Sequence, residues 1–289
     1  MRPTHLSILG VGLLGGSIGL AAKSVLTNCK ITGYAHRMQT RNLALQVGAI
    51  DQAASSIPEA IDGADLVILC TPVGLFESFL SEIAPALAKG TIVTDVGSTK
   101  RSIVRAANRF LGRKHRFVGS HPMAGSEKRG VEFARADLFR NALCLLTPEK
   151  RTDAEALAEV AAFWKLLGMR TTQLSPDKHD RILATISHLP HLAAAVLVAM
   201  QDPAAMNLAG KGFLDTTRIA SGDGALWRDI LLDNRDSMLA GIGKMEKLLK
   251  QARGWLKNGD REAIRAFLDE AAQRRDQLLK AKLREINQD

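Results

Sequence analysis

The sequence predicts an α/β protein in which a doubly wound parallel sheet is followed by an all-helical domain. Three observations indicate this. Short apolar runs alternate with helical patterns up to residue 174, an early turn is rich in glycine, and strand patterns disappear after Ser175 and Pro176. We therefore expect one domain over residues 1–174 and a helical domain over residues 175–289.

The beginning of the chain carries the most specific pattern. An apolar run at Leu6–Leu9 leads into a glycine-rich turn, a helical pattern continues to Val25, and a second strand-like run covers Lys30–Tyr34. This order forms the βαβ unit of the Rossmann fold, which holds a dinucleotide pyrophosphate at the helix N-terminus. A glycine turn that binds nothing is the plainer interpretation. The binding interpretation assigns cofactor contacts to Gly10, Gly12, Leu13, Leu14 and Gly15.

The end of the second strand-like run indicates which dinucleotide binds. A carboxylate is expected there to accept hydrogen bonds from the ribose, but this chain has Ala35, His36 and Arg37, with Arg41 one helical turn further on. Nothing there repels a 2′-phosphate, and a guanidinium can bind it through two hydrogen bonds. These residues favour NADP over NAD, although they also suit an ordinary solvated helix start.

The next elements follow as a doubly wound sheet requires. Residues 38–47 are typical of a helix, and Ala49–Ile50 is expected to be a short third strand. Leu66–Cys70 is apolar throughout, as in a central strand that is buried on both faces. It ends at Thr71 and Pro72, where the carboxyl end of a parallel strand faces the cofactor crevice.

The rest of the first domain alternates in the same way, as in parallel strands joined by crossover helices. Helices are expected at Leu75–Ala88, Arg101–Leu111 and Ala154–Leu167. Strands are expected at Ile92–Asp95, Arg116–Gly119, Ala142–Leu146 and Arg170–Leu174.

Two side chains with catalytic potential follow strands of this sheet. Ser98 comes shortly after the strand at Ile92–Asp95, and His121 lies after the strand at Arg116–Gly119, in an expected loop that continues with Pro122. Because a nicotinamide cofactor implies hydride transfer, the oxidised hydroxyl needs a group that accepts its proton. We expect His121 and Ser98 to converge on that hydroxyl, although a histidine in a proline turn is often only structural.

The helical half contains a long apolar segment. Residues 180–200 are rich in Ala and Leu and almost uncharged, which predicts a helix buried in a bundle or in a subunit interface. We expect a homodimer formed through this half; one helical layer packed on the sheet is the alternative. The pattern from Leu239 onward is amphipathic and highly charged, as in long surface helices.

Polar residues in the helical half suggest a second set of contacts. Arg218 lies in a largely uncharged neighbourhood and needs an anionic partner, either Asp215 or a substrate carboxylate. His188 and His191 are spaced as metal ligands can be, but no carboxylate or cysteine completes such a site. We therefore expect no metal.

Composition excludes several classes of protein. The chain has 289 residues, 46% hydrophobic and 24% charged, as in a globular protein. Its net charge of +9 comes without a basic stripe interleaved with aromatics, so we expect no nucleic acid as a partner. We find no signal peptide and expect no apolar stretch long enough to span a membrane. Three scattered cysteines without a CxxC motif fit a reducing cytoplasm.

Five sequence blocks together resemble the prephenate and arogenate dehydrogenases of tyrosine biosynthesis. They begin at Gly10, Asp95, Ser120, Ser187 and Phe213, and they read GVGLLGGS, DVGSTK, SHPMAGSE, SHLPH and FLDTTRIA. The resemblance covers nearly the whole chain. It implies a Rossmann domain, a helical dimerisation domain and the NAD(P)-dependent oxidative decarboxylation of prephenate to 4-hydroxyphenylpyruvate.

The resemblance also implies roles for individual residues. His121 matches the histidine that accepts the proton of the ring hydroxyl, and Ser98 matches a serine that orients this hydroxyl and the nicotinamide. Arg218 matches the arginine that holds a substrate carboxylate. The remaining implied pocket residues are His191 at the side-chain end, Ser126 and Glu127 at the rim, and His179 and Asp215 as support.

Several alternatives stay open. An arogenate or dual-specificity cyclohexadienyl dehydrogenase differs only in the substrate side chain, and the strength of the NADP preference is not decided. A β-hydroxyacid dehydrogenase or imine reductase would rely on a lysine or aspartate where this chain has the SHLPH block. A cofactor-sensing protein is the non-enzymatic alternative. We expect no room for a C-terminal regulatory ACT domain, so any tyrosine inhibition would act at the active site.

Overall fold

The computed structural model describes residues 2–112, 116–126 and 128–287. It divides into two compact units, Met1–Arg235 and Asp236–Asp289. The first unit contains the sheet together with the helices up to α11 (Gly224–Asp233). The domain boundary expected between residues 174 and 175 stays a prediction.

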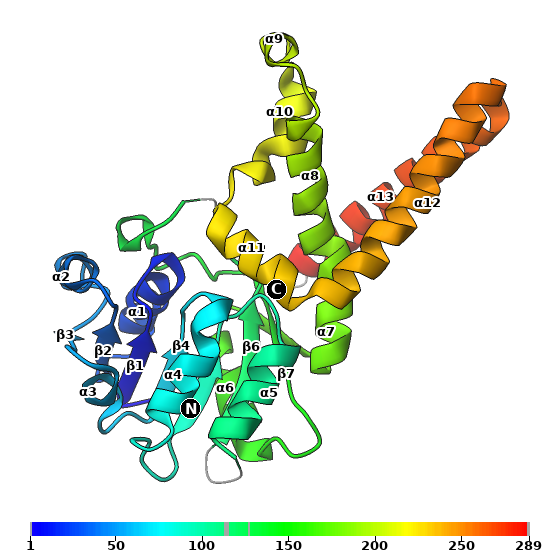
Figure 1. The fold of residues 1–289 in the computed structure, drawn as a ribbon. Helices are drawn as coiled ribbons and strands as arrows, with labels where there is room; N and C mark the ends of the chain where they lie inside the picture. Colours follow the sequence, from blue (N-terminus) through cyan, green and yellow to red (C-terminus); the bar gives the residue numbers. More distant parts are fainter. Residues whose placement is uncertain (1, 113–115, 127, 288–289) are drawn as a thin grey trace. The chain divides into compact units, whose positions relative to one another are not determined.

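The first unit is built on one sheet, which has eight strands in the described part of the chain, in the order β3-β2-β1-β4-β5-β6-β7-β8 (Figure 1). All neighbours pair in parallel except β6 and β7, which are antiparallel. The order reverses beside β1, where a doubly wound sheet opens its ligand crevice. The strands are β1 (His5–Leu9), β2 (Lys30–Tyr34), β3 (Gln52–Ala53), β4 (Leu66–Leu69), β5 (Ile92–Asp95), β6 (Arg116–Pro122), β7 (Leu143–Thr147) and β8 (Arg170–Gln173).

Helices cover both faces of the sheet and create two apolar cores. On β4, Leu66 and Ile68 join the core beneath α1, α2 and α6, whereas Val67 and Leu69 join the core beneath α3, α4 and α5. Successive side chains of a strand point to opposite faces, so both faces of β4 are buried, as its apolar run predicts. These helices are α1 (Leu13–Val25), α2 (Met38–Gln46), α3 (Ile57–Ile61), α4 (Phe76–Ile83), α5 (Arg101–Phe110) and α6 (Ala154–Leu166), with short 3-10 turns η1 (Val73–Leu75) and η2 (Val131–Phe133).

Three expected elements differ from the structure. Ala49–Ile50 is not a strand: both backbone N–H groups donate to the Ala44 carbonyl and close the end of α2, and β3 begins at Gln52. The helix expected at Leu75–Ala88 ends at Ile83, because Pro85 lacks the N–H that another turn needs. The strand expected to end at Gly119 continues to Pro122, because antiparallel pairing with β7 extends that far.

The apolar segment of the helical half is one helical run, Pro176–Ala199, and an 18-residue window within it has a mean hydropathy of 1.8. By length and composition alone it could cross a membrane, which corrects the expectation that no stretch is long enough; core helices of soluble proteins pass the same test. Ile186 and Val196 are 63% and 54% exposed, so the run is not buried inside a bundle of this unit. The run comprises α7 (Pro176–Leu183), the π-helical turn η3 (Ala184–His188) and α8 (Leu189–Ala199).

Short helices complete the first unit, and two long helices form the second. The short elements are α9 (Pro203–Met206), α10 (Lys211–Thr217), the 3-10 turn η4 (Arg218–Ser221) and α11. The second unit comprises α12 (Arg235–Asn258) from Asp236 onward and α13 (Arg261–Asn287), which contact each other through Trp255 and Phe267. Their described side chains are mostly exposed and many are charged, as the amphipathic pattern predicts.

Candidate functional site

The glycine turn between β1 and α1 has the geometry that a bound pyrophosphate requires. Gly10 has a φ of +111°, and a Cβ atom there would lie 2.5 Å from the Cys70 carbonyl oxygen. A Cβ atom at Gly15 would lie 2.1 Å from the Gly10 carbonyl oxygen, so helix and strand can pack this closely only without a side chain. At Gly12 no atom lies within 4 Å of a Cβ position, which leaves open space above the turn.

Two cavities meet at this turn. One, of about 650 Å³, extends past the end of β2 and is lined by Gly10, Ala35 and His36. The other, of about 520 Å³, extends toward Ser98 and His121. Both cavities are lined by Gly12, Thr71 and Pro72. Together they offer adjoining spaces on the two sides of a pyrophosphate position, as a dinucleotide needs. Leu13 and Leu14 also line the second cavity.

The two arginines expected to bind the adenosine end of the cofactor differ in their contacts. Arg37 is exposed at the residue that precedes α2. The Arg41 guanidinium donates hydrogen bonds to the carbonyls of Ala54 and Ser55, at 3.1 and 3.2 Å, and lies over the Tyr34 ring. Neither arginine is among the residues that line the described cavities, whereas His36 is.

His121 and Ser98 line the same cavity at the carboxyl edge of the sheet. The prediction that His121 lies in a loop is wrong. The residue lies within β6, opposite Leu145 of β7. Its side chain is only 8% exposed. A strand fixes the backbone of a residue more rigidly than a loop does, so the imidazole has a defined direction.

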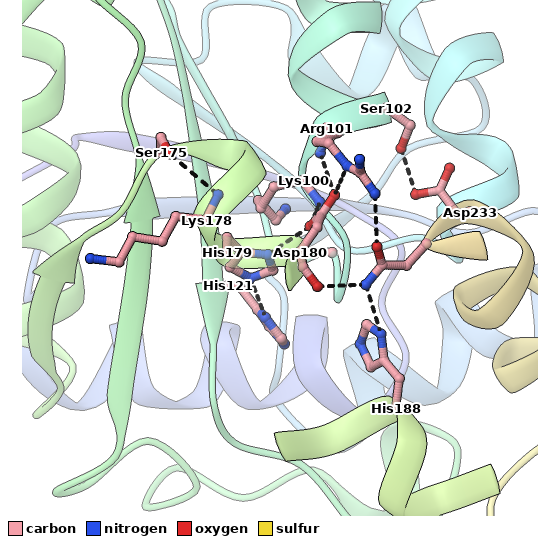
Figure 2. A network of polar contacts seen from close by, with 12 residues as sticks. Lys100, Arg101, Ser102, His121, Ser175, Lys178, His179, Asp180, His188 and Asp233 are labelled. Carbon is pink, nitrogen blue, oxygen red and sulfur yellow. Dashed lines mark hydrogen bonds and ion pairs between the residues drawn. The ribbon is translucent and has the colours of Figure 1, made fainter. Parts of the chain in front are cut away.

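A chain of hydrogen bonds extends behind His121 (Figure 2). Its Nδ1 lies 2.9 Å from Nε2 of His179, and Nδ1 of His179 lies 2.8 Å from Oδ1 of Asp180. His179 and Asp180 come from α7 and are completely buried. His179 was expected only in a supporting role, and Asp180 was given no role at the site.

The carboxylate of Asp180, at the end of this hydrogen-bond chain, determines which nitrogens carry protons. Burial raises the pKa of Asp180, but hydrogen bonds from His179 and from backbone N–H groups outweigh burial and leave the pKa lowered. The carboxylate can only accept, so His179 carries its proton on Nδ1 and offers a lone pair at Nε2. His121 then donates from Nδ1, which leaves its own lone pair at Nε2. Burial, followed by the neighbouring His179 and Lys100, lowers the pKa of His121 well below its usual value and keeps this lone pair free at neutral pH.

Asp180 also joins the two halves of the first unit. Its carboxylate accepts hydrogen bonds from the backbone N–H groups of Lys100 and Arg101, at 2.8 and 2.9 Å, and so caps the N-terminus of α5. An anion at a helix N-terminus is stabilised by the helix dipole. The cap places α7, and with it His179, against the edge of the sheet.

A buried ion pair positions the loop that contains Ser98. Lys100 Nζ contacts Asp95 Oδ2, and both side chains are completely inaccessible to solvent. The Asp95 carboxylate also accepts hydrogen bonds from the N–H groups of Gly97, at 2.8 Å, and Ser120, at 3.0 Å. One carboxylate therefore holds both the Ser98 loop and the strand that carries His121.

A third cavity, of about 630 Å³, is lined by His191, Arg218 and Trp227. The His191 ring stacks on the Trp227 ring with centroids 3.5 Å apart and planes 13° apart. Ser126 lines this cavity and also the one at His121. Two aromatic rings and a guanidinium suit a ligand with an apolar ring and a carboxylate.

Among the described residues, Asp215 is an expected pocket residue that is not brought to these cavities. Asp215 is exposed on α10 and is not among the lining residues. Glu127 lies outside the described residues. Conversely, Asp180, His188, Asn234 and Trp227 were not predicted; a polar His179–Asp180 pair at the start of an apolar helix is the signal that could have indicated the first of them.

Comparison with known proteins gives two family matches. Residues 18–173 match the family described as "Prephenate dehydrogenase, nucleotide-binding domain". Residues 175–270 match the family described as "Prephenate dehydrogenase, dimerization domain". The two matches together cover most of the chain.

Individual relatives match nearly the full length of this chain. The chain is 37% identical to a prephenate dehydrogenase of Bacillus subtilis, over 96% of this chain and 76% of that protein. It is 32% identical to a cyclohexadienyl dehydrogenase of Zymomonas mobilis, over 94% of each. A crystal structure of prephenate dehydrogenase from A. aeolicus, in complex with hydroxyphenyl propionate and NAD+, superposes with a TM-score of 0.90 at 33% identity, over 95% of this chain and 98% of that one.

Proposed function

Because the chain belongs to the prephenate dehydrogenase family, we propose that it oxidises and decarboxylates prephenate to 4-hydroxyphenylpyruvate with a nicotinamide dinucleotide as hydride acceptor. The observation that supports this most is the His121–His179–Asp180 chain beside the cavity at Ser98. It offers a neutral, directed base next to the place where the glycine turn would leave a nicotinamide.

The residues present fit such a cofactor. Gly12, Thr71 and Pro72 would contact its central part, and the open space above Gly12 would accommodate the pyrophosphate. When bound, the nicotinamide ring accepts the hydride from the substrate carbon that bears the hydroxyl. Every other step uses groups of this chain.

His121 handles the proton of the substrate hydroxyl. As hydride leaves the carbon, His121 Nε2 accepts the hydroxyl proton, and the C=O bond of a dienone forms. The bond between the ring and its carboxylate then breaks, CO2 leaves, and the electron pair moves through the ring to the oxygen. That oxygen takes the proton back from His121 as a phenol. His179 and Asp180 stabilise the imidazolium that exists between these two transfers.

The cavity at Trp227 suits the rest of the substrate. Arg218 would bind a carboxylate through its planar guanidinium, and His191 and Ser126 would contact the side-chain end. The Bacillus relative is named for prephenate and the Zymomonas relative for cyclohexadienyl substrates in general. A dual-specificity enzyme that also oxidises arogenate is therefore the second candidate.

NADP remains our proposed preference over NAD. It rests on Ala35 in place of a carboxylate, on His36 beside the adenosine-end cavity, and on exposed Arg37 next to it in the sequence. Arg41 supports it less, because its guanidinium is held by backbone carbonyls. Replacing Arg37 with Ala should raise the KM for NADP+ about tenfold, the value of one charge-assisted hydrogen bond, and leave the KM for NAD+ unchanged.

A homodimer is our proposed assembly. The dimerization-domain match includes α8, whose exposed Val196 and Leu197 give it an apolar face to bury. Cytoplasmic localisation is proposed with it, from the reduced state expected of the three cysteines.

Steady-state rates test the whole proposal. Prephenate and arogenate would each be assayed with NAD+ and with NADP+. We expect rapid NADP+ reduction with prephenate and slower reduction with NAD+. No reduction with either cyclohexadienol would refute the enzymatic function, and a strong preference for NAD+ would refute the proposed cofactor choice.

A further inference from the structure

His188 is a buried histidine that the proposed mechanism does not use. It is the last residue of the π-helical turn η3, and its side chain is 1% exposed. It lines the same cavity as Ser98 and His121. Single π-helical turns inside α-helices occur frequently at functional sites, because they redirect one side chain.

Asn234 determines which nitrogen of His188 carries the proton. Oδ1 of Asn234 accepts a hydrogen bond from Arg101 Nη2 at 3.0 Å, and Nδ2 donates to the Asp180 carbonyl at 2.7 Å. Arginine can only donate and a carbonyl can only accept, so the orientation of the amide is fixed by chemistry. Nδ2 of Asn234 also lies 3.2 Å from Nδ1 of His188. Because that amide nitrogen can only donate, Nδ1 of His188 must accept.

The proton of His188 is therefore on Nε2. Burial lowers the pKa of His188 to about 4, so the ring is neutral at pH 7 and carries a single N–H. This Nε2 is buried and makes no hydrogen bond of ordinary geometry with a described residue, although a weaker backbone interaction with Ser98 raises the pKa of the ring. A buried N–H without a partner is unfavourable because it has lost its hydrogen bond to water, so such groups need an explanation.

We propose that His188 is a ligand-binding residue whose Nε2–H donates a hydrogen bond to an oxygen of the ligand bound beside Ser98 and His121, with Asn234 as the positioning residue. The inference rests on the proposed function. The two imidazoles at the cavity then have opposite polarity: His121 offers a lone pair, and His188 offers an N–H. Asp180 supports both, through its carboxylate toward His179 and through its carbonyl toward Asn234.

The expected acceptor of this hydrogen bond is an oxygen of a planar group, and two ligands carry such a group. The substrate carries a ring carboxylate, and the cofactor carries a carboxamide carbonyl. A neutral donor suits either group. A cation facing the ring carboxylate would stabilise its negative charge in the bound substrate, and this charge disappears as CO2 leaves. A neutral N–H can orient the carboxylate and raises the activation barrier less, because it stabilises that charge less strongly.

Two variants of His188 test the donor. His188→Gln places an amide near the position of Nε2, whereas His188→Asn reaches only the position of Nδ1. We expect kcat/KM for prephenate to fall about 10- to 100-fold in His188→Asn, the value of one hydrogen bond to a charged or buried acceptor, and to recover largely in His188→Gln. Equal rates in both variants and in the unmodified protein would overturn the proposal. Equal loss in both variants, each folded by thermal unfolding, would do so as well.

The binding of dinucleotide alone identifies the source of the oxygen. If the acceptor is the substrate carboxylate, His188→Asn weakens prephenate binding and leaves the Kd for NADP+ unchanged. If it is the carboxamide, the Kd for NADP+ rises by the same factor without substrate. Both results support a donor at Nε2, and an unchanged Kd together with an unchanged KM and kcat contradicts it.

The tautomer can be measured without any assay of activity. In ¹⁵N-histidine-labelled protein, His188 is assigned by its absence from His188→Gln, and we expect its Nε2 to be the protonated nitrogen. Asn234→Asp replaces the donating amide by an acceptor and should move the proton to Nδ1, with a fall in kcat/KM similar to that of His188→Asn. Asn28→Asp, an exposed site in the turn before β2, makes the same charge change and should have no effect.

A proton on Nδ1 of His188 in the unmodified protein would overturn the inference even if the enzyme is fully active. Conversely, a protein that is inactive toward both cyclohexadienols but has its proton on Nε2 would contradict the proposed function and leave the tautomer assignment standing. The two failures are therefore distinguishable.

Discussion

Replacing His179 with Leu should reduce turnover while leaving cofactor binding intact. Leucine has nearly the volume of histidine and cannot accept the hydrogen bond that His121 Nδ1 makes at 2.9 Å. When His121 takes the substrate proton, this hydrogen bond becomes charge-assisted, with Asp180 behind it. Such bonds contribute about 1.5–3 kcal/mol, so kcat should fall about 10- to 150-fold.

The loss should be larger than this if His121 also changes its tautomer. Without the lone pair of His179, nothing holds the proton of His121 on Nδ1, and a proton on Nε2 abolishes the base. The unsatisfied N–H should cost about 1–3 kcal/mol in the free energy of unfolding, because His121 is only 8% exposed.

The assay is the steady-state formation of reduced nicotinamide with saturating prephenate, together with the Kd for dinucleotide and the midpoint of thermal unfolding. A structural role alone would lower stability and leave kcat per folded enzyme unchanged. A kcat within threefold of the unmodified enzyme, in a folded variant, would refute the reasoning about the hydrogen-bond chain.

Four further predictions follow from the same geometry. Because burial holds the pKa of His121 below its usual value, kcat/KM should fall only as the pH drops through that lowered value; a pH–rate profile without an acid limb contradicts it. His188 has a folded pKa of about 4 against about 6.5 unfolded, so the unfolded chain binds its proton first, and the free energy of unfolding should lose about 3 kcal/mol as the pH falls between these values. His188→Gln should remove that share of the slope in denaturant titrations. Gly12→Ala should weaken dinucleotide binding without loss of stability, whereas Gly15→Ala should lower the unfolding temperature, because only at Gly15 does a Cβ atom meet a carbonyl at 2.1 Å; similar unfolding temperatures would contradict this. Lys100→Met should destabilise the fold by about 3–5 kcal/mol by leaving Asp95 buried without its partner, and an unchanged unfolding free energy would contradict it.

Local patterns were sufficient for much of the fold. The glycine turn at Gly10–Gly15, the apolar run of β4 and the strands at Lys30–Tyr34 and Ile92–Asp95 were predicted as the structure has them. These features depend on neighbours in the chain: φ at a turn, alternation of side chains along a strand, and the period of a helix. The family was recognisable for the same reason, because its sequence blocks are contiguous.

Other features depended on pairing between distant segments. His121 was expected in a loop because nothing near it in the sequence shows that β7 pairs with β6 in the antiparallel direction as far as Pro122. Ala49 and Ile50 looked like a strand because they are apolar, yet they close the end of α2 instead. Hydrophobicity alone reports burial and does not report which hydrogen-bond partner a backbone group finds.

The sequence by itself determined that the first elements of the chain have the pattern of a dinucleotide-binding unit. It also identified His121 and Ser98 as candidate catalytic residues and Arg218 as a candidate substrate-binding residue. Only the tertiary structure decided how His121 is held. Asp180 lies 59 residues beyond His121 in the chain and Asn234 a further 54, yet their hydrogen bonds set the position of a proton on each of two imidazoles. A tautomer depends on contacts made in space, and no local pattern of residues encodes it.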